Sequence, residues 1–310
     1  MPINAQARAF LDRALSAGAP DISEQGVYLA RSNSHVEPDI AGPVGPGAKI
    51  DHQYFTGPSA DIPIHIYTPE GEGPFRALLY FHGGGWVLNY LTRYDAQLVA
   101  LAKATNSVVV SVNYQKAPEH KFPTPFNDCY AALEWAVANA EALNIDLTKL
   151  GVGGDSAGGN LASAVALKAR DAGQIALAYQ LLIYPCNGPE FVAEPSVPNA
   201  EGYGLTQRGM KWLWEQYLNG DQDNNNPYAV PHSARNFSGL PPTVIITAEF
   251  DVLREDGIAY TQKLKDAGVE VSYKDMAGMI HGFFNYGKYI DDGIAVRDYF
   301  AGEINRILSV

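Results

Sequence analysis

The chain has 310 residues, of which 46% are hydrophobic and 18% charged, and its formal net charge is -12. The composition is that of a globular protein with a large core, and the length suits a single α/β domain that carries an insertion. The negative charge argues against binding to nucleic acid or to an anionic membrane, because both require clustered Lys and Arg.

Signals for export and for membrane insertion are missing from the sequence. No apolar run approaches the roughly 18 residues that span a bilayer, and MPINAQARAFLDRAL at the N-terminus lacks a basic region followed by an apolar run. Cys129 and Cys186 are the two cysteines, and we expect buried thiols rather than a disulfide. No Cys/His cluster has metal-ligand spacing. We therefore expect a cytoplasmic protein.

The N-terminal part predicts one helix and then a loose region. Asn4 can cap the helix, and apolar residues follow at helical spacing, namely Ala7, Phe10, Leu11, Ala14 and Leu15. Residues 31–50 are rich in Pro, Gly and Ser and predict a linker or a flap.

From about residue 50, strand patterns alternate with helix patterns. Two segments alternate like half-buried antiparallel strands, at 50–55 and 62–69. Nearly continuous apolar runs predict parallel strands covered on both faces, at 77–83, 107–114, 176–185 and 243–250. Helical patterns lie around 95–104, 127–144, 158–171, 256–267 and 292–308. With further strands before Ser156 and at 269–275, the chain predicts an α/β fold with a mostly parallel eight-stranded sheet flanked by helices.

Residues 187–241 interrupt this alternation. The segment is polar, rich in Asn and Pro, and too long for a plain connection. Its clear helix, TQRGMKWLWEQYL, has an apolar face made of Met210, Leu213, Trp214, Tyr217 and Leu218. We expect a lid or cap; the alternative is that this face packs on the body, and both can hold at once.

Residues 154–158 read Gly-Asp-Ser-Ala-Gly between a short strand and a helix. This pattern is typical of a nucleophile elbow, in which glycines permit a strained turn that presents the serine at the positive end of the helix. The alternatives are a phosphate-binding loop or a plain turn, but a Walker-type loop needs a Lys that is missing here.

A serine nucleophile needs an oxyanion hole and a base. HGGGW at 82–86 follows a predicted strand, and its glycine amides can point into a site; we predict Gly84 and Gly85 as donors together with Ala157, with Gly83 less suited. The alternative is a tight turn without a ligand.

The base and the acid should come late in the chain, in the order Ser, acid, His. His281 follows the last predicted strand and is our candidate base, whereas His232 lies in the insertion and is expected at the surface. Asp251 ends a strand and is our candidate acid. Its competitors are Glu249, Glu255 and Asp256, the last two in the first turn of a helix, where acids are favourable anyway.

Together these motifs resemble those of hormone-sensitive-lipase-like esterases, also called bacterial esterase family IV. The matching segments are HGGGW (82–86), NYQKAPEHKFPTPFNDCYAAL (113–133), GDSAGGNLA (154–162), LLIYP (181–185), EFDVLRED (249–256) and MIHGFF (279–284). The chain departs from the usual pattern at Gln115, Lys116, Lys121, Val252 and Glu255.

The resemblance implies an α/β-hydrolase fold with a helical cap and no cofactor. It implies Ser156 as nucleophile, Asp251 as acid, His281 as base, and an oxyanion hole from Gly84, Gly85 and Ala157. The cap would comprise residues 1–48 and the insertion 187–241, over a catalytic core of 49–186 and 242–310.

We therefore expect a serine carboxylesterase for short-chain acyl esters, with a small-molecule ester as its partner. Alternatives are an amidase or peptidase on the same scaffold, or a receptor that binds without turnover, against which the presence of His281 argues. Residues 269–275 could form an open sheet edge, so a homodimer is also considered.

Overall fold

One eight-stranded sheet organises the molecule. The computed structural model describes residues 2–18, 20–35, 37, 39–192 and 198–309. The strands are β1 (Ala48–Thr56), β2 (Asp61–Pro69), β3 (Phe75–Phe81), β4 (Ser107–Val112), β5 (Ile145–Asp155), β6 (Tyr179–Ile183), β7 (Thr243–Phe250) and β8 (Val271–Ile280). Their order across the sheet is β1-β2-β4-β3-β5-β6-β7-β8. The pairs β1–β2 and β2–β4 are antiparallel, and the other five pairs are parallel. The expected mostly parallel eight-stranded sheet is thus confirmed.

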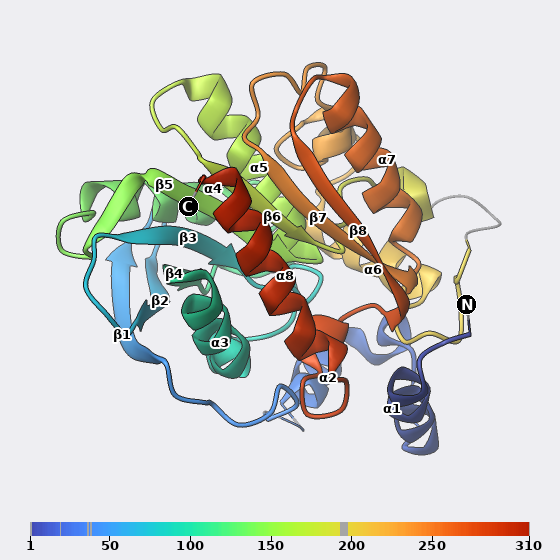
Figure 1. Cartoon of the computed structure of the whole chain (residues 1–310). Coiled ribbons are helices and arrows are strands. Elements are labelled where there is room, and N and C mark those ends of the chain that lie inside the picture. The colour runs from blue at the N-terminus through green and yellow to red at the C-terminus, as the bar shows by residue number, and fades with distance from the viewer. Residues whose placement is uncertain (1, 19, 36, 38, 193–197, 310) are drawn as a thin grey trace.

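Helices cover both faces of this sheet. They are α1 (Ala5–Ser16), α2 (Ile22–Ser34), α3 (Asp95–Thr105), α4 (Thr124–Ala138), α5 (Ala157–Ala172), α6 (Gln207–Tyr217), α7 (Arg254–Asp266) and α8 (Asp292–Ile307). Figure 1 shows α3 and α8 in front of the sheet, and α1 and α2 beside its lower right end.

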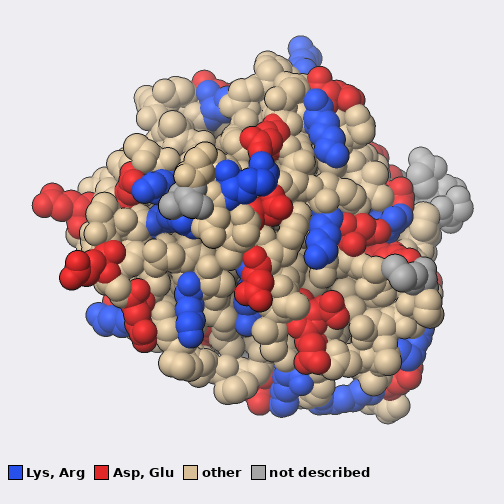
Figure 2. Space-filling view, in the orientation of Figure 1, with Lys and Arg blue, Asp and Glu red and all other residues tan. Residues whose placement is uncertain are grey.

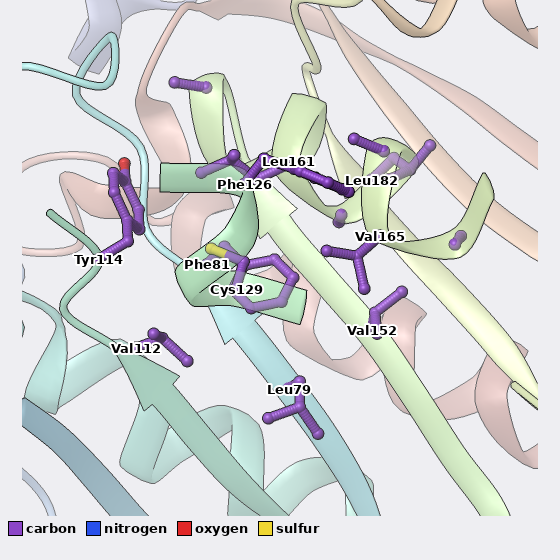
Figure 3. Packing of buried hydrophobic residues seen from close by; sticks show 14 of the residues in the cluster. Leu79, Phe81, Val112, Tyr114, Phe126, Cys129, Val152, Leu161, Val165 and Leu182 are labelled. Carbon is purple, nitrogen blue, oxygen red and sulfur yellow. The ribbon is translucent and has the colours of Figure 1, made fainter. Parts of the chain in front are cut away.

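Alternation along the strands explains the two layers of core. In β3, Leu79 and Phe81 join the apolar cluster that includes residues of α4 and α5, whereas Leu78 and Tyr80 join the cluster that includes residues of α3 and α8. Figure 3 shows the first cluster from close by, with Phe81 beside Cys129 and Leu79 further along β3. Because both faces of the central strands are buried, their sequences are almost wholly apolar.

The structure differs from the sequence prediction in the N-terminal part. The region expected to be a linker or flap begins within a helix, because residues 31–34 form the last turn of α2. This helix escaped prediction because Gly26, with φ of 69°, breaks its regular geometry and most of its residues are polar or small. Helix α1 was predicted, and Asn4 caps it by accepting from the amides of Gln6 and Ala7, but Leu15 is 67% exposed.

Two further predictions concern the later helices. The helix expected at 127–144 ends at Ala138, so the segment after it is not helical. The helix of the insertion, α6, forms as predicted, and the five apolar residues of its expected face are all buried.

The surface carries both signs of charge. On the face drawn in Figure 2, Lys and Arg are interspersed with Asp and Glu rather than gathered in one patch. Over the ranges that the structure describes, none of the helices combines the length and the apolar character needed to cross a membrane.

Candidate active site

Ser156 lies on the sharp turn between β5 and α5. Its backbone has φ of 55° and ψ of -120°, which is a strained conformation for a residue with a side chain. Gly158 is required here, because a Cβ at that position would lie 1.8 Å from the carbonyl oxygen of Phe81. The turn therefore packs directly against the end of β3 and presents Ser156 at the N-terminus of α5.

His281 and Asp251 reach Ser156 from the ends of two neighbouring strands. His281 follows β8 and Asp251 follows β7, and the carboxyl ends of parallel strands meet at one edge of the sheet. The His281 Nε2 atom lies 3.0 Å from the Ser156 Oγ atom. The His281 Nδ1 atom lies 2.7 Å from a carboxylate oxygen of Asp251. The three residues named from the sequence thus form one continuous hydrogen-bonded chain.

The competing acids lie elsewhere. Glu249 accepts a hydrogen bond from the amide of Gly278, and Glu255 pairs with Arg254 at the surface. Asp256 is buried. Of the four acids considered, Asp251 is the one that contacts His281.

The expectation that His232 lies at the surface was wrong. Its ring is buried, and its Nε2 atom lies 3.0 Å from a carboxylate oxygen of Asp256. The two residues are 24 positions apart, and periodicity gives no signal for such a pairing across two elements. Asp256 is therefore a buried partner of the insertion rather than a solvated acid at a helix N-terminus.

The glycine loop after β3 offers two free amides. The Gly83 amide donates to the Asp155 carboxylate at 2.9 Å and to the Tyr94 hydroxyl at 3.1 Å, so it is already engaged. Gly84 and Gly85 have φ of 112° and 59°, and within the described ranges neither amide donates to a protein acceptor. The amide of Ala157, the first residue of α5, has no intrahelical acceptor.

Asp155, the residue before the serine, braces this loop. Besides the Gly83 amide, its carboxylate accepts hydrogen bonds from Tyr80, Tyr94 and Asn285 at 2.9, 3.2 and 2.8 Å. Burial raises the pKa of Asp155. Local sequence patterns assign Asp155 no role, although its place next to the serine is a signal.

His82 holds the loop from the other side and also escaped the sequence analysis. Its Nδ1–H donates to the Gly83 carbonyl at 2.7 Å, and its ring stacks on Tyr114 at 4.4 Å. Burial holds the pKa of the His82 imidazole well below its usual range. We conclude that His82 is neutral and shapes the loop rather than exchanging protons.

Two neighbouring cavities share His281 in their walls. The first has a volume of about 300 Å³ and is lined by Gly84, Gly85, Ser156 and His281, among others. The second, of about 470 Å³, lies between α1, α2 and residues 201–208 and is largely apolar. Four residues line both, namely Ile22, Leu205, His281 and Tyr286.

Helix α6 covers the glycine loop. The Trp86 ring stacks on Tyr217 with centroids 4.3 Å apart, and it contacts Trp214 at 4.4 Å. Leu213 packs directly on Gly85: a Cβ atom added to Gly85 would lie 2.4 Å from the Leu213 side chain. The aromatic face of α6 therefore packs on the body, and Leu213 on the same face lines the cavity.

A parallel sheet that presents a serine on the turn between β5 and α5, with an imidazole after the last strand, is the arrangement of an α/β hydrolase. A family model described as alpha/beta hydrolase fold matches residues 78–285. The chain belongs to this family, and within it to the hormone-sensitive-lipase-like branch.

Relatives agree with this assignment. The esterase LipI of Mycobacterium tuberculosis is 35% identical over 79% of this chain and 78% of its own. The ethyl acetate hydrolase of Pseudomonas putida is 34% identical over 74% of each chain. The structure of ester-hydrolase EH1AB1 from the metagenome of Lake Arreo superposes with a TM-score of 0.92 and 33% identity, covering 99% of this chain and 100% of that one. The protein is a carboxylic ester hydrolase of this family.

Proposed function

We propose that the protein is a serine carboxylesterase that hydrolyses short-chain acyl esters through an acyl-enzyme, with Ser156 as nucleophile, His281 as base and Asp251 as acid. The hydrogen-bonded chain from Ser156 through His281 to Asp251 carries this proposal. A serine hydroxyl becomes a useful nucleophile only when a base in contact takes its proton, and here the base is itself held by a buried carboxylate.

The reaction proceeds in two acyl transfers. Ser156 attacks the ester carbonyl as its proton passes to His281, and the amides of Gly84, Gly85 and Ala157 stabilise the oxyanion. His281 then gives the proton to the departing alcohol. Water attacks the acyl-enzyme in the same geometry and releases the acid. Asp251 keeps the ring proton of His281 on Nδ1, so that the Nε2 atom facing Ser156 is unprotonated and can accept the serine proton.

The short-chain preference rests on the covered cavities. Residues 1–48 and 187–241 form the proposed cap over a core of 49–186 and 242–310; residues 1, 19, 36, 38 and 193–197 of these segments lie outside the described part. Helices α1, α2 and α6 supply walls of the two cavities, and a covered pocket favours a small ester over a lipid surface. That one relative is an ethyl acetate hydrolase supports the same class.

An amidase or peptidase would use the same residues. A receptor without turnover is disfavoured, because the base is present and in contact with the serine. The cytoplasm remains the proposed compartment, since both cysteines are free and buried, and a homodimer remains the proposed assembly.

The test is hydrolysis of p-nitrophenyl acetate, butyrate and palmitate, triolein and a matched anilide by purified protein. We expect the two short esters to be preferred, and Ser156→Ala to lower kcat by at least about 10³-fold with its fold intact. Ser238→Ala, at an exposed position outside the cavities, is the matched control. Retained turnover by Ser156→Ala would refute Ser156 as the nucleophile. Cleavage of the anilide faster than of the esters would favour the amidase.

A further inference from the structure

Arg93 lies in the wall of the cavity that contains Ser156 and His281. It belongs to a short 3-10 turn, Leu91–Tyr94, which follows the glycine loop. Its side chain is half-buried. The proposed mechanism gives this residue no role, yet it places a permanent positive charge in the wall of the cavity that contains the reacting groups.

The charge of Arg93 has no carboxylate partner. Its Nη1 donates to the backbone carbonyls of Ser34 and Glu37 at 2.8 and 3.1 Å. No ion pair joins Arg93 to an acid in the described residues, and neither Nε nor Nη2 has a hydrogen-bond acceptor there. The Glu37 carboxylate is instead taken by Arg13 and Lys288.

The acid in the same cavity wall, Asp155, forms no ion pair with Arg93 among the described residues. Asp155 accepts four hydrogen bonds from its own neighbours. The lining of this cavity also includes the uncharged side chains of Gln25, Asn33 and Asn89. A half-buried guanidinium without an ion-pair partner favours an anion, and its Nε–Nη2 edge, which has no acceptor among the described residues, matches a carboxylate bidentately.

We propose that the preferred substrates are short esters that carry a second group, a carboxylate, and that Arg93 binds this carboxylate. This inference rests on the proposed esterase activity and names its substrate class. Since Arg93 and Ser156 line one cavity of about 300 Å³, the carboxylate must lie only a few bonds from the scissile ester. The two carbonyls that hold Nη1 fix the guanidinium before substrate binds, which lowers the entropic cost of the contact.

The test compares kcat/KM within pairs of equal shape and different charge. For a carboxylate on the acyl side, the pair is monoethyl glutarate and its neutral monoamide, ethyl 4-carbamoylbutanoate. For a carboxylate on the alcohol side, it is 2-acetoxypropanoate and 2-acetoxypropanamide. We expect the enzyme to favour the anion at least about tenfold in one pair, and the preference to fall with added salt. The pair that responds tells which side of the ester faces Arg93.

Variants assign the preference to Arg93. Arg93→Met should lower kcat/KM for the anion by about 10–100-fold more than for the amide, and Arg93→Lys should keep part of the preference. Arg31→Met is the matched control: Arg31 also joins α2 to the core through backbone carbonyls, but Glu119 neutralises it and it does not line this cavity. It should affect both members of a pair equally.

The outcomes separate the two proposals. If the enzyme hydrolyses no member of either pair and no simple acetyl ester, the proposed function is overturned. Hydrolysis of both members at similar rates, or a preference that Arg93→Met leaves intact, would overturn only the role of Arg93. If Arg93→Met does not fold, the salt dependence of the wild-type preference and the behaviour of Arg93→Lys still decide.

Discussion

At the scale of single residues, the site depends on a few positions where the chain accepts an unfavourable state. Ser156 adopts a strained backbone, and Gly158 is needed because any side chain would meet Phe81.

Lys116 is a further residue in an unfavourable state, away from the reacting groups. Its ammonium donates to the Asn113 side chain and to the Tyr114 carbonyl at 2.6 and 3.2 Å. Burial, with a smaller effect of the nearby Arg31 charge, lowers the pKa of Lys116 from 10.5 to about 8.

A lowered lysine pKa means that the charge of this half-buried ammonium opposes folding. Below pH 8 both states hold the proton, and the folded state bears the full cost of burial. Between about pH 8 and 10.5 the unfolded chain keeps a proton that the folded chain has released, so this group makes the free energy of unfolding rise with pH. Above that window both states are neutral.

We therefore expect Lys116→Leu to raise the free energy of unfolding at pH 7 by about 1–3 kcal/mol. The gain should shrink as pH rises from 8 to 10.5. Urea denaturation of both proteins at pH 7 and pH 10 measures the difference. A gain that is the same at both pH values would show that packing, not charge burial, is responsible.

At the scale of elements, one carboxylate ties the ends of the insertion to the core. Asp256, in the first turn of α7, accepts from the amides of Asn187 and Gly188 at 2.8 and 3.0 Å, where the insertion begins. Its other oxygen contacts His232, near the end of the insertion. Lys263 of the same helix donates to the His232 carbonyl at 2.8 Å. Helix α7 thereby holds both ends of a segment that supplies part of the cavity wall.

His232→Ala should lower the free energy of unfolding by about 1–3 kcal/mol, because a buried carboxylate loses one partner but keeps two amides. Complete loss of a partner for a buried charge would cost more, about 3–5 kcal/mol. His120→Ala, at an exposed position, is the control and should change stability by less than about 0.5 kcal/mol. Equal effects of the two substitutions in urea denaturation would contradict the role of the pair.

At the scale of the whole molecule, the sheet ends in an open edge. Strand β8 is last in the strand order and pairs with β7. Its other side carries backbone groups without a strand partner in the described part of the chain, and such an edge can pair with a second copy. The net charge of -12 opposes close approach of two copies, so added salt should favour any such pairing.

We expect light scattering after size exclusion to give twice the mass of one chain. In hydrogen exchange, amides of residues 271–276 should exchange more slowly at high protein concentration than after dilution. A single-chain mass across concentrations and salt would rule out the dimer. A dimer without concentration-dependent protection at 271–276 would place its interface elsewhere.

Much of the fold and the main site residues could be predicted from local patterns. Apolar runs identify the central strands, because both of their faces are buried. Gly154 and Gly158 around Ser156 identify the turn, because a side chain at either position would collide with the carbonyl of Phe81. The order of serine, acid and histidine then points to Asp251 and His281, each directly after a strand.

Only the tertiary structure decided which of these groups meet and which are already used. In the folded protein the Gly83 amide donates to Asp155, and His232 pairs with Asp256. Arg93 has no carboxylate partner among the residues described. Local patterns predict the burial and the backbone conformation of a short segment, because both depend largely on the residue types within that segment. Partnerships between distant segments depend on side-chain positions that arise only when the sheet, the helices and the insertion pack together.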